Sequence, residues 1–107
     1  FGQGVPAAAM DEHLSVLGSL PAIEAALAWY RANKGLAADI GTIAVPTLYV
    51  WGDADATVGP DAARGTGDFV GGAFAMEVLP GVGHFVMDQA PARAVELLLA
   101  HLARHPA

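Results

Sequence analysis

The amino-acid sequence predicts an α/β domain that contains two parallel strands. Two short apolar runs, "VPTLYVW" (45–51) and "FAMEVL" (74–79), have the length and composition of buried strands. A weakly helical stretch separates them, and a strongly amphipathic helix follows the second run. This order of strand, helix, strand and helix is typical of parallel strands that are joined by a crossover helix.

Two helices are expected ahead of the first strand. Residues 1–9 are rich in Gly, Pro and Ala and are predicted to form a loop, and "MDEHLSVL" (10–17) to form a short helix. Ser19 suits an N-cap, and apolar residues then recur at helical spacing over 21–34. Gly35 follows as the expected C-cap of that helix.

The remaining elements follow the same reasoning. The first strand run is apolar on both faces, as in a buried parallel strand. The segment 60–70 is predicted to form a weak helix, because its glycines lower helix propensity. The segment 91–104 is predicted to form a strong helix with a single apolar stripe made by Val95, Leu98, Leu99 and Leu102.

The composition indicates that more surface is buried than a chain of 107 residues buries alone. The chain is 54% hydrophobic and only 15% charged, whereas a domain of this size buries about two-thirds of its unfolded surface. It begins at Phe1, in a segment without the charged region of a signal peptide. We therefore expect a docking partner or a missing portion, and a cytoplasmic protein whose sequence begins inside a longer one.

Charge and cysteine content exclude several classes of partner. Five Lys and Arg against eleven Asp and Glu give a net charge of −6, without any basic run, so nucleic-acid binding is not expected. The apolar runs are too short to span a membrane, and no membrane partner is expected. The chain has no cysteines, which excludes disulfides and thiolate metal sites.

An acid and a histidine follow the two predicted strands. Asp53 and Asp55 come after the first strand, and His84 comes after the second. If the strands are neighbours, these side chains meet at the carboxyl edge of the sheet. There a carboxylate can fix the tautomer of an imidazole, which then accepts a proton from a nucleophile or a water. Each residue taken alone also fits a simpler role in a turn or in packing.

A nucleophile to complete such a set is missing from the sequence. The serines, Ser15 and Ser19, lie outside any G-x-S-x-G frame, and "GPDAA" (59–63) and "GDFVG" (67–71) do not provide the equivalent aspartate frame. One hydrolase class orders its triad as nucleophile, acid and histidine along the chain. This sequence contains candidates for the last two members.

The motifs around these residues resemble the carboxyl-terminal part of α/β-hydrolase-fold enzymes, and the branch of epoxide hydrolases and haloalkane dehalogenases in particular. The resemblance lies in "VPTLYVWGDADATVG" and "FAMEVLPGVGHFVMDQAP", and more weakly in "HLSVLGSLPAIEAALAWYR". It implies that Asp55, rather than Asp53, is the acid and that His84 is the general base. It places Tyr30 where an epoxide hydrolase tyrosine contacts the epoxide oxygen, and it makes Phe85 a candidate pocket residue.

The resemblance also implies a division of the chain and a function. Residues 1–40 would be the end of a lid and the helix returning from it, and residues 41–107 the carboxyl-terminal part of the core. The enzyme would hydrolyse an epoxide or similar small apolar substrate through a covalent ester intermediate. It would be inactive without an N-terminal part that carries the nucleophile and the oxyanion hole. The alternatives are a serine esterase or lipase-type hydrolase and a non-catalytic binding module.

Other chemistries fit the residues less well. "DADATV" matches the D-x-D-x-[TV] pattern of haloacid-dehalogenase-type phosphatases, but that reaction needs a phosphate-binding lysine, and no lysine follows Lys34. "GTGDFVG" (65–71) has the wrong spacing for a dinucleotide fingerprint. Asp53, Asp55 and His84 make a poor metal site because they include a single histidine. We therefore expect no metal and no cofactor.

Overall fold

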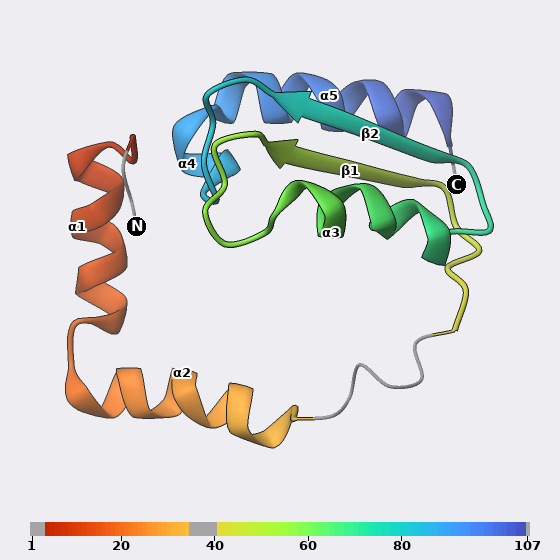
Figure 1. The fold of residues 1–107 in the computed structure, drawn as a ribbon. Helices are drawn as coiled ribbons and strands as arrows, with labels where there is room; N and C mark the ends of the chain where they lie inside the picture. The colour runs from red at the N-terminus through yellow and green to blue at the C-terminus, as the bar shows by residue number, and fades with distance from the viewer. Residues whose placement is uncertain (1–3, 35–40, 107) are drawn as a thin grey trace. The chain divides into compact units, whose positions relative to one another are not determined.

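The computed structural model describes residues 4–34 and 41–106, which form helices and a small sheet (Figure 1). In chain order the elements are α1 (Ala7–Leu17), α2 (Leu20–Ala32), β1 (Thr47–Gly52), α3 (Pro60–Gly65), the 3-10 helix η2 (Thr66–Phe69), β2 (Phe74–Leu79), α4 (Val86–Gln89) and α5 (Pro91–Arg104). The described chain is thus a mixed α/β structure.

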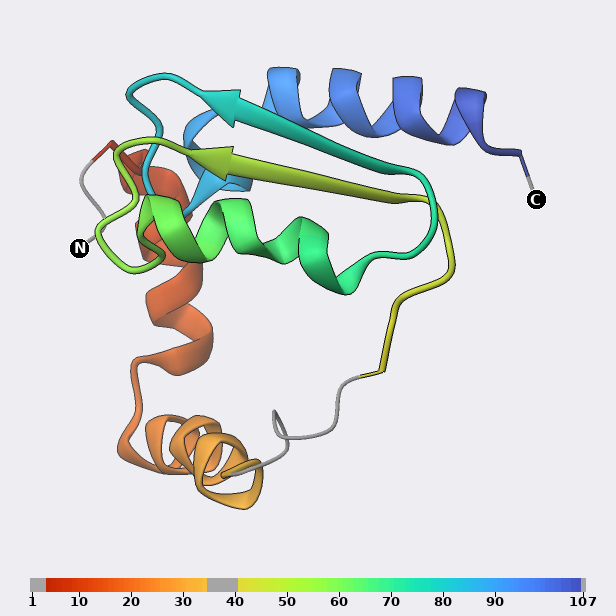
Figure 2. The same ribbon diagram turned by 45° about the vertical axis from the view of Figure 1, so that its right-hand side comes forward.

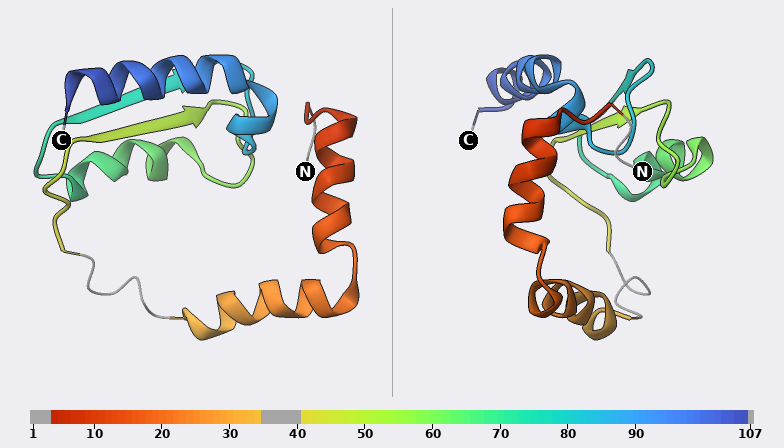
Figure 3. Two further views of the ribbon diagram at one scale, coloured as in Figure 1. Left: turned by 180° about the vertical axis from the view of Figure 1, so that it is seen from behind. Right: turned by 90° about the vertical axis from the view of Figure 1, so that its left-hand side faces the viewer.

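The two strands pair in parallel, as the sequence predicted. Their register runs from Thr47 opposite Phe74 to Gly52 opposite Leu79, so both strands end at the same edge. The connection between them runs through α3 and η2, and α5 follows β2. Figures 1, 2 and 3 show α3 and α5 on opposite sides of the strands. The carboxyl ends of β1 and β2 therefore present their loops side by side.

The predicted boundaries of the later elements need small corrections. β1 begins at Thr47, because Pro46 has no N–H and Thr47 makes the first ladder bond, to the carbonyl of Ala73 (2.8 Å). The predicted helix 60–70 is divided into α3 and a tighter 3-10 turn. The short helix α4, between the His84 loop and α5, was not predicted. β2 and α5 have the predicted bounds.

The predicted ends of the first two helices are wrong by a few residues. The first helix begins at Ala7 inside the expected loop, because three alanines with high helix propensity follow Pro6. α2 begins at Leu20, one residue before the predicted start, with the expected N-cap Ser19, whose hydroxyl accepts a hydrogen bond from the N–H of Ala22 (3.4 Å). It ends at Ala32, because Asn33 caps it by donating from its side chain to the carbonyl of Trp29 (2.7 Å). The expected cap Gly35 lies outside the described residues.

The chain contains two compact units. One holds α1 and α2, and the other holds the sheet with α3, α4 and α5. In the first unit neither helix has a buried residue. The second unit has a small core, formed where the sheet meets α3 and α5, of Trp51, Ala63, Leu79, Ala94 and Leu97.

Helix α5 buries a different face from the one that its apolar stripe suggested. Its buried residues are Ala94, Leu97 and His101. The four residues of the predicted stripe stay exposed over 44–60% of their surface: Val95, Leu98, Leu99 and Leu102. The sheet unit therefore carries an uncovered apolar strip along α5. Within the described part of the chain, no helix has both the length and the apolar character to cross a membrane.

Candidate active site

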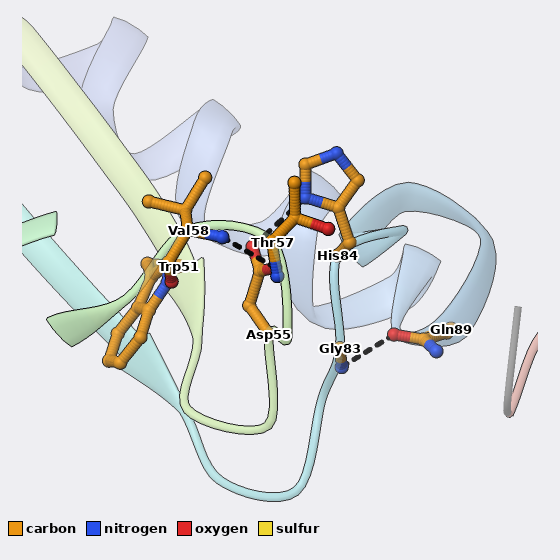
Figure 4. Close-up of polar contacts among 7 residues, drawn as sticks. All are labelled: Trp51, Asp55, Thr57, Val58, Gly83, His84 and Gln89. Atoms are coloured by element: carbon orange, nitrogen blue, oxygen red, sulfur yellow. Dashed lines mark hydrogen bonds and ion pairs between the residues drawn. The ribbon is translucent and has the colours of Figure 1, made fainter. Parts of the chain in front are cut away.

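The loops that leave the carboxyl ends of β1 and β2 bring Asp55 and His84 together (Figure 4). The Nδ1 atom of His84 lies 3.0 Å from the Oδ2 atom of Asp55. The two residues are far apart in sequence but meet because Gly52 and Leu79, the last residues of the strands, are directly paired. The expected juxtaposition of an acid and an imidazole at one sheet edge is thus present in the structure.

The carboxylate of Asp55 is held on both oxygens. Its Oδ1 atom accepts hydrogen bonds from the backbone N–H groups of Thr57 (2.7 Å) and Val58 (3.0 Å), which leaves Oδ2 for His84. The indole of Trp51 donates to the carbonyl of Val58 (3.0 Å) and anchors the same loop (Figure 4). Only 6% of the Asp55 side chain is exposed. The carboxylate is therefore fixed in one orientation.

These contacts fix the charge of Asp55 and the tautomer of His84. Burial alone would raise the pKa of Asp55, but hydrogen bonds from His84, Val58 and Thr57 outweigh burial and lower that pKa below its ordinary value. The carboxylate is ionised at neutral pH, so Oδ2 accepts and Nδ1 of His84 donates. In the neutral imidazole the lone pair then resides on Nε2. With 41% of its side chain exposed, His84 combines a buried, oriented side with an accessible one.

Asp53, the other candidate acid, serves a different purpose. Its Oδ1 atom accepts a 2.6 Å hydrogen bond from the N–H of Gly81, in the loop that leads to His84. The next residue, Ala54, donates its N–H to the carbonyl of Val82 (3.0 Å). Gly81 has φ +71°, a conformation that favours glycine. Asp53 therefore joins the two loops, and Asp55 makes the contact with the imidazole.

A further contact holds the histidine loop and had no clear sequence signal. The N–H of Gly83 donates to the Oε1 atom of Gln89 at the end of α4, over 2.6 Å (Figure 4). This hydrogen bond joins the backbone just before His84 to the end of α4. Phe85 lies beside the histidine, with its ring edge-on at a centroid distance of 5.5 Å. The backbone on both sides of His84 is thus constrained.

Close packing of the two loops makes the glycine that ends β1 indispensable. A Cβ atom added at Gly52 would lie far inside contact distance of the Val82 carbonyl, a backbone group. We expect Gly52→Ala to lower the free energy of unfolding by about 1–3 kcal/mol or more, as overpacking does. Denaturant unfolding measures the effect. Gly59→Ala is the matched control, because a Cβ there meets no atom within 4 Å; equal losses in the two variants would contradict the packing argument.

The lowered pKa of Asp55 predicts an acid-sensitive contribution to stability. In a group whose folded pKa lies below its ordinary value of 3.8, the stabilisation is complete above that value. It is lost as the pH falls through the folded pKa. The difference in unfolding free energy between the wild type and Asp55→Asn should therefore shrink as the pH is lowered from about 5 toward 2. A difference that does not change over this range would show that folding does not lower the pKa of Asp55.

Tyr30 lies on α2, in the other compact unit. It is 68% exposed, and its ring meets the ring of Trp29 edge-on at 5.1 Å. The Asp55–His84 pair belongs to the sheet unit. Its assignment to the substrate remains a prediction.

The carboxylates and imidazole at the sheet edge do not converge on one point. Asp53 turns to Gly81, and Asp55 turns to His84. Across residues 4–34 and 41–106, no three His, Asp or Glu side chains come together in a way that could hold a metal ion. An imidazole that is oriented by an ionised carboxylate, as His84 is by Asp55, is suited to proton transfer.

Comparison of the chain with protein-family models, with curated proteins and with solved structures gave no match. The functional conclusion therefore depends on the geometry of the Asp55–His84 pair and on the chemistry that such a pair performs.

Proposed function

We propose that this chain is the carboxyl-terminal part of an α/β-hydrolase and supplies the acid and the histidine of a catalytic triad. The observation that carries the proposal is the 3.0 Å contact between Nδ1 of His84 and Oδ2 of Asp55, at the carboxyl edge of two parallel strands. Ligands of open parallel sheets bind at this edge. The substrate class is an epoxide or similar small apolar molecule, hydrolysed through a covalent ester intermediate.

In the proposed reaction His84 is the general base. A carboxylate nucleophile from the N-terminal part opens the epoxide and forms an ester with the substrate. Nε2 of His84 then takes a proton from a water as that water attacks the ester carbonyl. The imidazolium that forms is stabilised by ionised Asp55 through the Nδ1–H bond. Collapse of the tetrahedral intermediate breaks the bond between the ester carbonyl and the substrate oxygen, and that oxygen takes the proton from Nε2 of His84 and leaves as the diol. The carboxyl group loses a proton, which replaces the one taken up by the epoxide oxygen at ring opening, and is a carboxylate again.

Four features support a partner segment that completes the enzyme. The sequence lacks a nucleophile in the required frame, and His84 presents an accessible side. Among the described strands, β1 and β2 each have one neighbour, so each has an unpaired edge. The exposed apolar strip of α5, defined above, lies on the same unit and provides surface for packing. The proposed partner is the N-terminal part of the same hydrolase.

The nucleophile decides between this function and a serine esterase, and a trapping experiment tells them apart. In an aspartate enzyme, removal of His84 blocks only the hydrolysis of the intermediate, so the ester accumulates. In a serine enzyme the histidine is needed to form the intermediate, so none accumulates. The experiment mixes His84→Ala enzyme, assembled with the N-terminal part, with an epoxide and measures intact mass.

The proposal expects one epoxide mass added per enzyme molecule in His84→Ala, and no lasting addition in the wild type. Hydrolysis of simple esters by the wild type, without any adduct in the variant, would assign a serine esterase instead. The third alternative, a binding module, requires that the wild type neither turns over nor forms an adduct with either substrate.

Tyr30 gives a more specific prediction for the epoxide reaction. A tyrosine hydroxyl that donates to the epoxide oxygen stabilises the charge that develops there during ring opening. Tyr30→Phe removes that donor and should slow ester formation on an epoxide by about 10²-fold. Hydrolysis of the trapped ester should be unchanged, since His84 performs that step. Single-turnover kinetics separates the two steps, and an unchanged rate of ring opening would remove Tyr30 from the site.

A further inference from the structure

A pair of histidines lies at the carboxyl end of α5. His101 is 8% exposed, and His105, one helical turn later, is exposed at the C-cap. Their ring centroids are 4.7 Å apart, and the rings are tilted by 53°. Both rings line a hollow of about 490 Å³ together with Pro46, Leu102, Arg104 and Pro106. The hollow and the loop of Asp55 lie at opposite ends of β1, because Pro46 precedes that strand and Asp55 follows it.

The contacts of His101 fix its neutral tautomer. Its Nε2 atom lies 3.3 Å from the carbonyl oxygen of Pro46, which accepts hydrogen bonds and donates none. The proton is therefore on Nε2, and Nδ1 carries a lone pair. Nδ1 is buried, and no group in the described part of the chain forms a hydrogen bond with it. A buried acceptor without a partner calls for an explanation in terms of a ligand.

We propose that His101 and His105 bind a divalent transition-metal ion of the Zn²⁺ type. A metal-binding histidine commonly donates its other ring N–H to a backbone carbonyl, as His101 does to Pro46. Two histidines one turn apart on a helix present their imidazoles on the same face. Metal binding requires that the exposed ring of His105 turn toward Nδ1 of His101 and that the ion reach this buried atom from the hollow. Waters fill the remaining coordination positions.

The surroundings select the kind of metal ion. The residues that line the hollow include no carboxylate, so hard ions such as Mg²⁺ and Ca²⁺ have no suitable ligand there. Imidazole ligands suit Zn²⁺, Ni²⁺ and Cu²⁺. The negative end of the α5 dipole favours a cation. Arg104 opposes it, but the Nε atom of that residue donates to the carbonyl of Ala100 (3.2 Å), which ties the side chain to the helix.

A bound ion would join the last turn of α5 to the segment before β1, through His101 and its bond to Pro46. This role is independent of the proposed hydrolase function, because the ion touches neither Asp55 nor His84. Metal binding to the folded sheet unit would raise its free energy of unfolding, by an amount that grows with the logarithm of the free metal concentration.

The test titrates ZnCl₂ into the full chain by calorimetry, with MgCl₂ as the comparison, and follows the ring nitrogens of the histidines by NMR. One Zn²⁺ should bind, Mg²⁺ should not, and Nδ1 of His101 should shift. His105→Ala, at an exposed position, should weaken Zn²⁺ binding by about tenfold or more, while His13→Ala on α1 should leave it unchanged. Absence of Zn²⁺ binding to the wild type, or equal binding by the wild type and His105→Ala, would overturn the proposal.

Discussion

His84→Ala should lower the turnover of the proposed hydrolase, assembled with its N-terminal part, by about 10³-fold or more. The imidazole is oriented by a buried carboxylate, and 41% of its side chain is exposed. Without it, water must attack the ester without a base. Because only hydrolysis of the ester is slowed, kcat and KM should both fall, while the rate of ester formation should stay near that of the wild type.

Steady-state kinetics of the wild type and of His84→Ala measures this effect, and circular dichroism confirms that the variant is folded. His105→Ala is the matched control, because it removes an exposed histidine at the C-cap of α5, outside the loops that carry Asp55 and His84. Turnover of His84→Ala within a few-fold of the wild type would show that another group acts as the base.

Asp55→Asn should lower kcat by about 10³- to 10⁴-fold, whereas Asp53→Asn should have a mild effect. Asparagine at position 55 keeps an oxygen for the N–H groups of Thr57 and Val58, so the loop is preserved. Its amide nitrogen cannot accept from Nδ1 of His84, which favours the wrong tautomer of the imidazole. Asparagine at position 53 still accepts from Gly81, and that contact is structural.

The comparison is informative because the two substitutions are chemically identical and two residues apart. Each variant is measured for kcat and for unfolding free energy, so that loss of activity is separated from loss of fold. If Asp53→Asn were the more damaging for kcat at equal stability, the acid would have to be assigned to Asp53.

The strand pair and the position of its loops could be predicted from sequence because they depend on local patterns. Each strand is a short apolar run followed closely by glycine, a pattern typical of a buried strand that ends in a turn. The choice between Asp53 and Asp55 needed the family pattern, since both follow the same strand. In the structure these carboxylates turn to Gly81 and His84, respectively.

Other features could not be predicted because they depend on which groups meet in the folded chain. Helical periodicity showed that α5 has an apolar stripe, but it did not show which face of the helix is buried. In the structure Ala94, Leu97 and His101 are buried, and the larger side chains of the stripe stay exposed. The anchors of the triad loops, from Trp51 to Val58 and from Gln89 to Gly83, join side chains to backbone groups that carry no sequence signature.

The tautomer of His84 tests the Asp55–His84 pair most directly, and nitrogen–proton correlation NMR of the imidazole ring measures it. In the neutral ring the proton should be on Nδ1, and the Nδ1 resonance should change in Asp55→Asn but not in Asp53→Asn. A ring that carries its proton on Nε2, or an Nδ1 resonance that is the same in the wild type and in Asp55→Asn, would contradict the pairing on which the proposed catalysis depends.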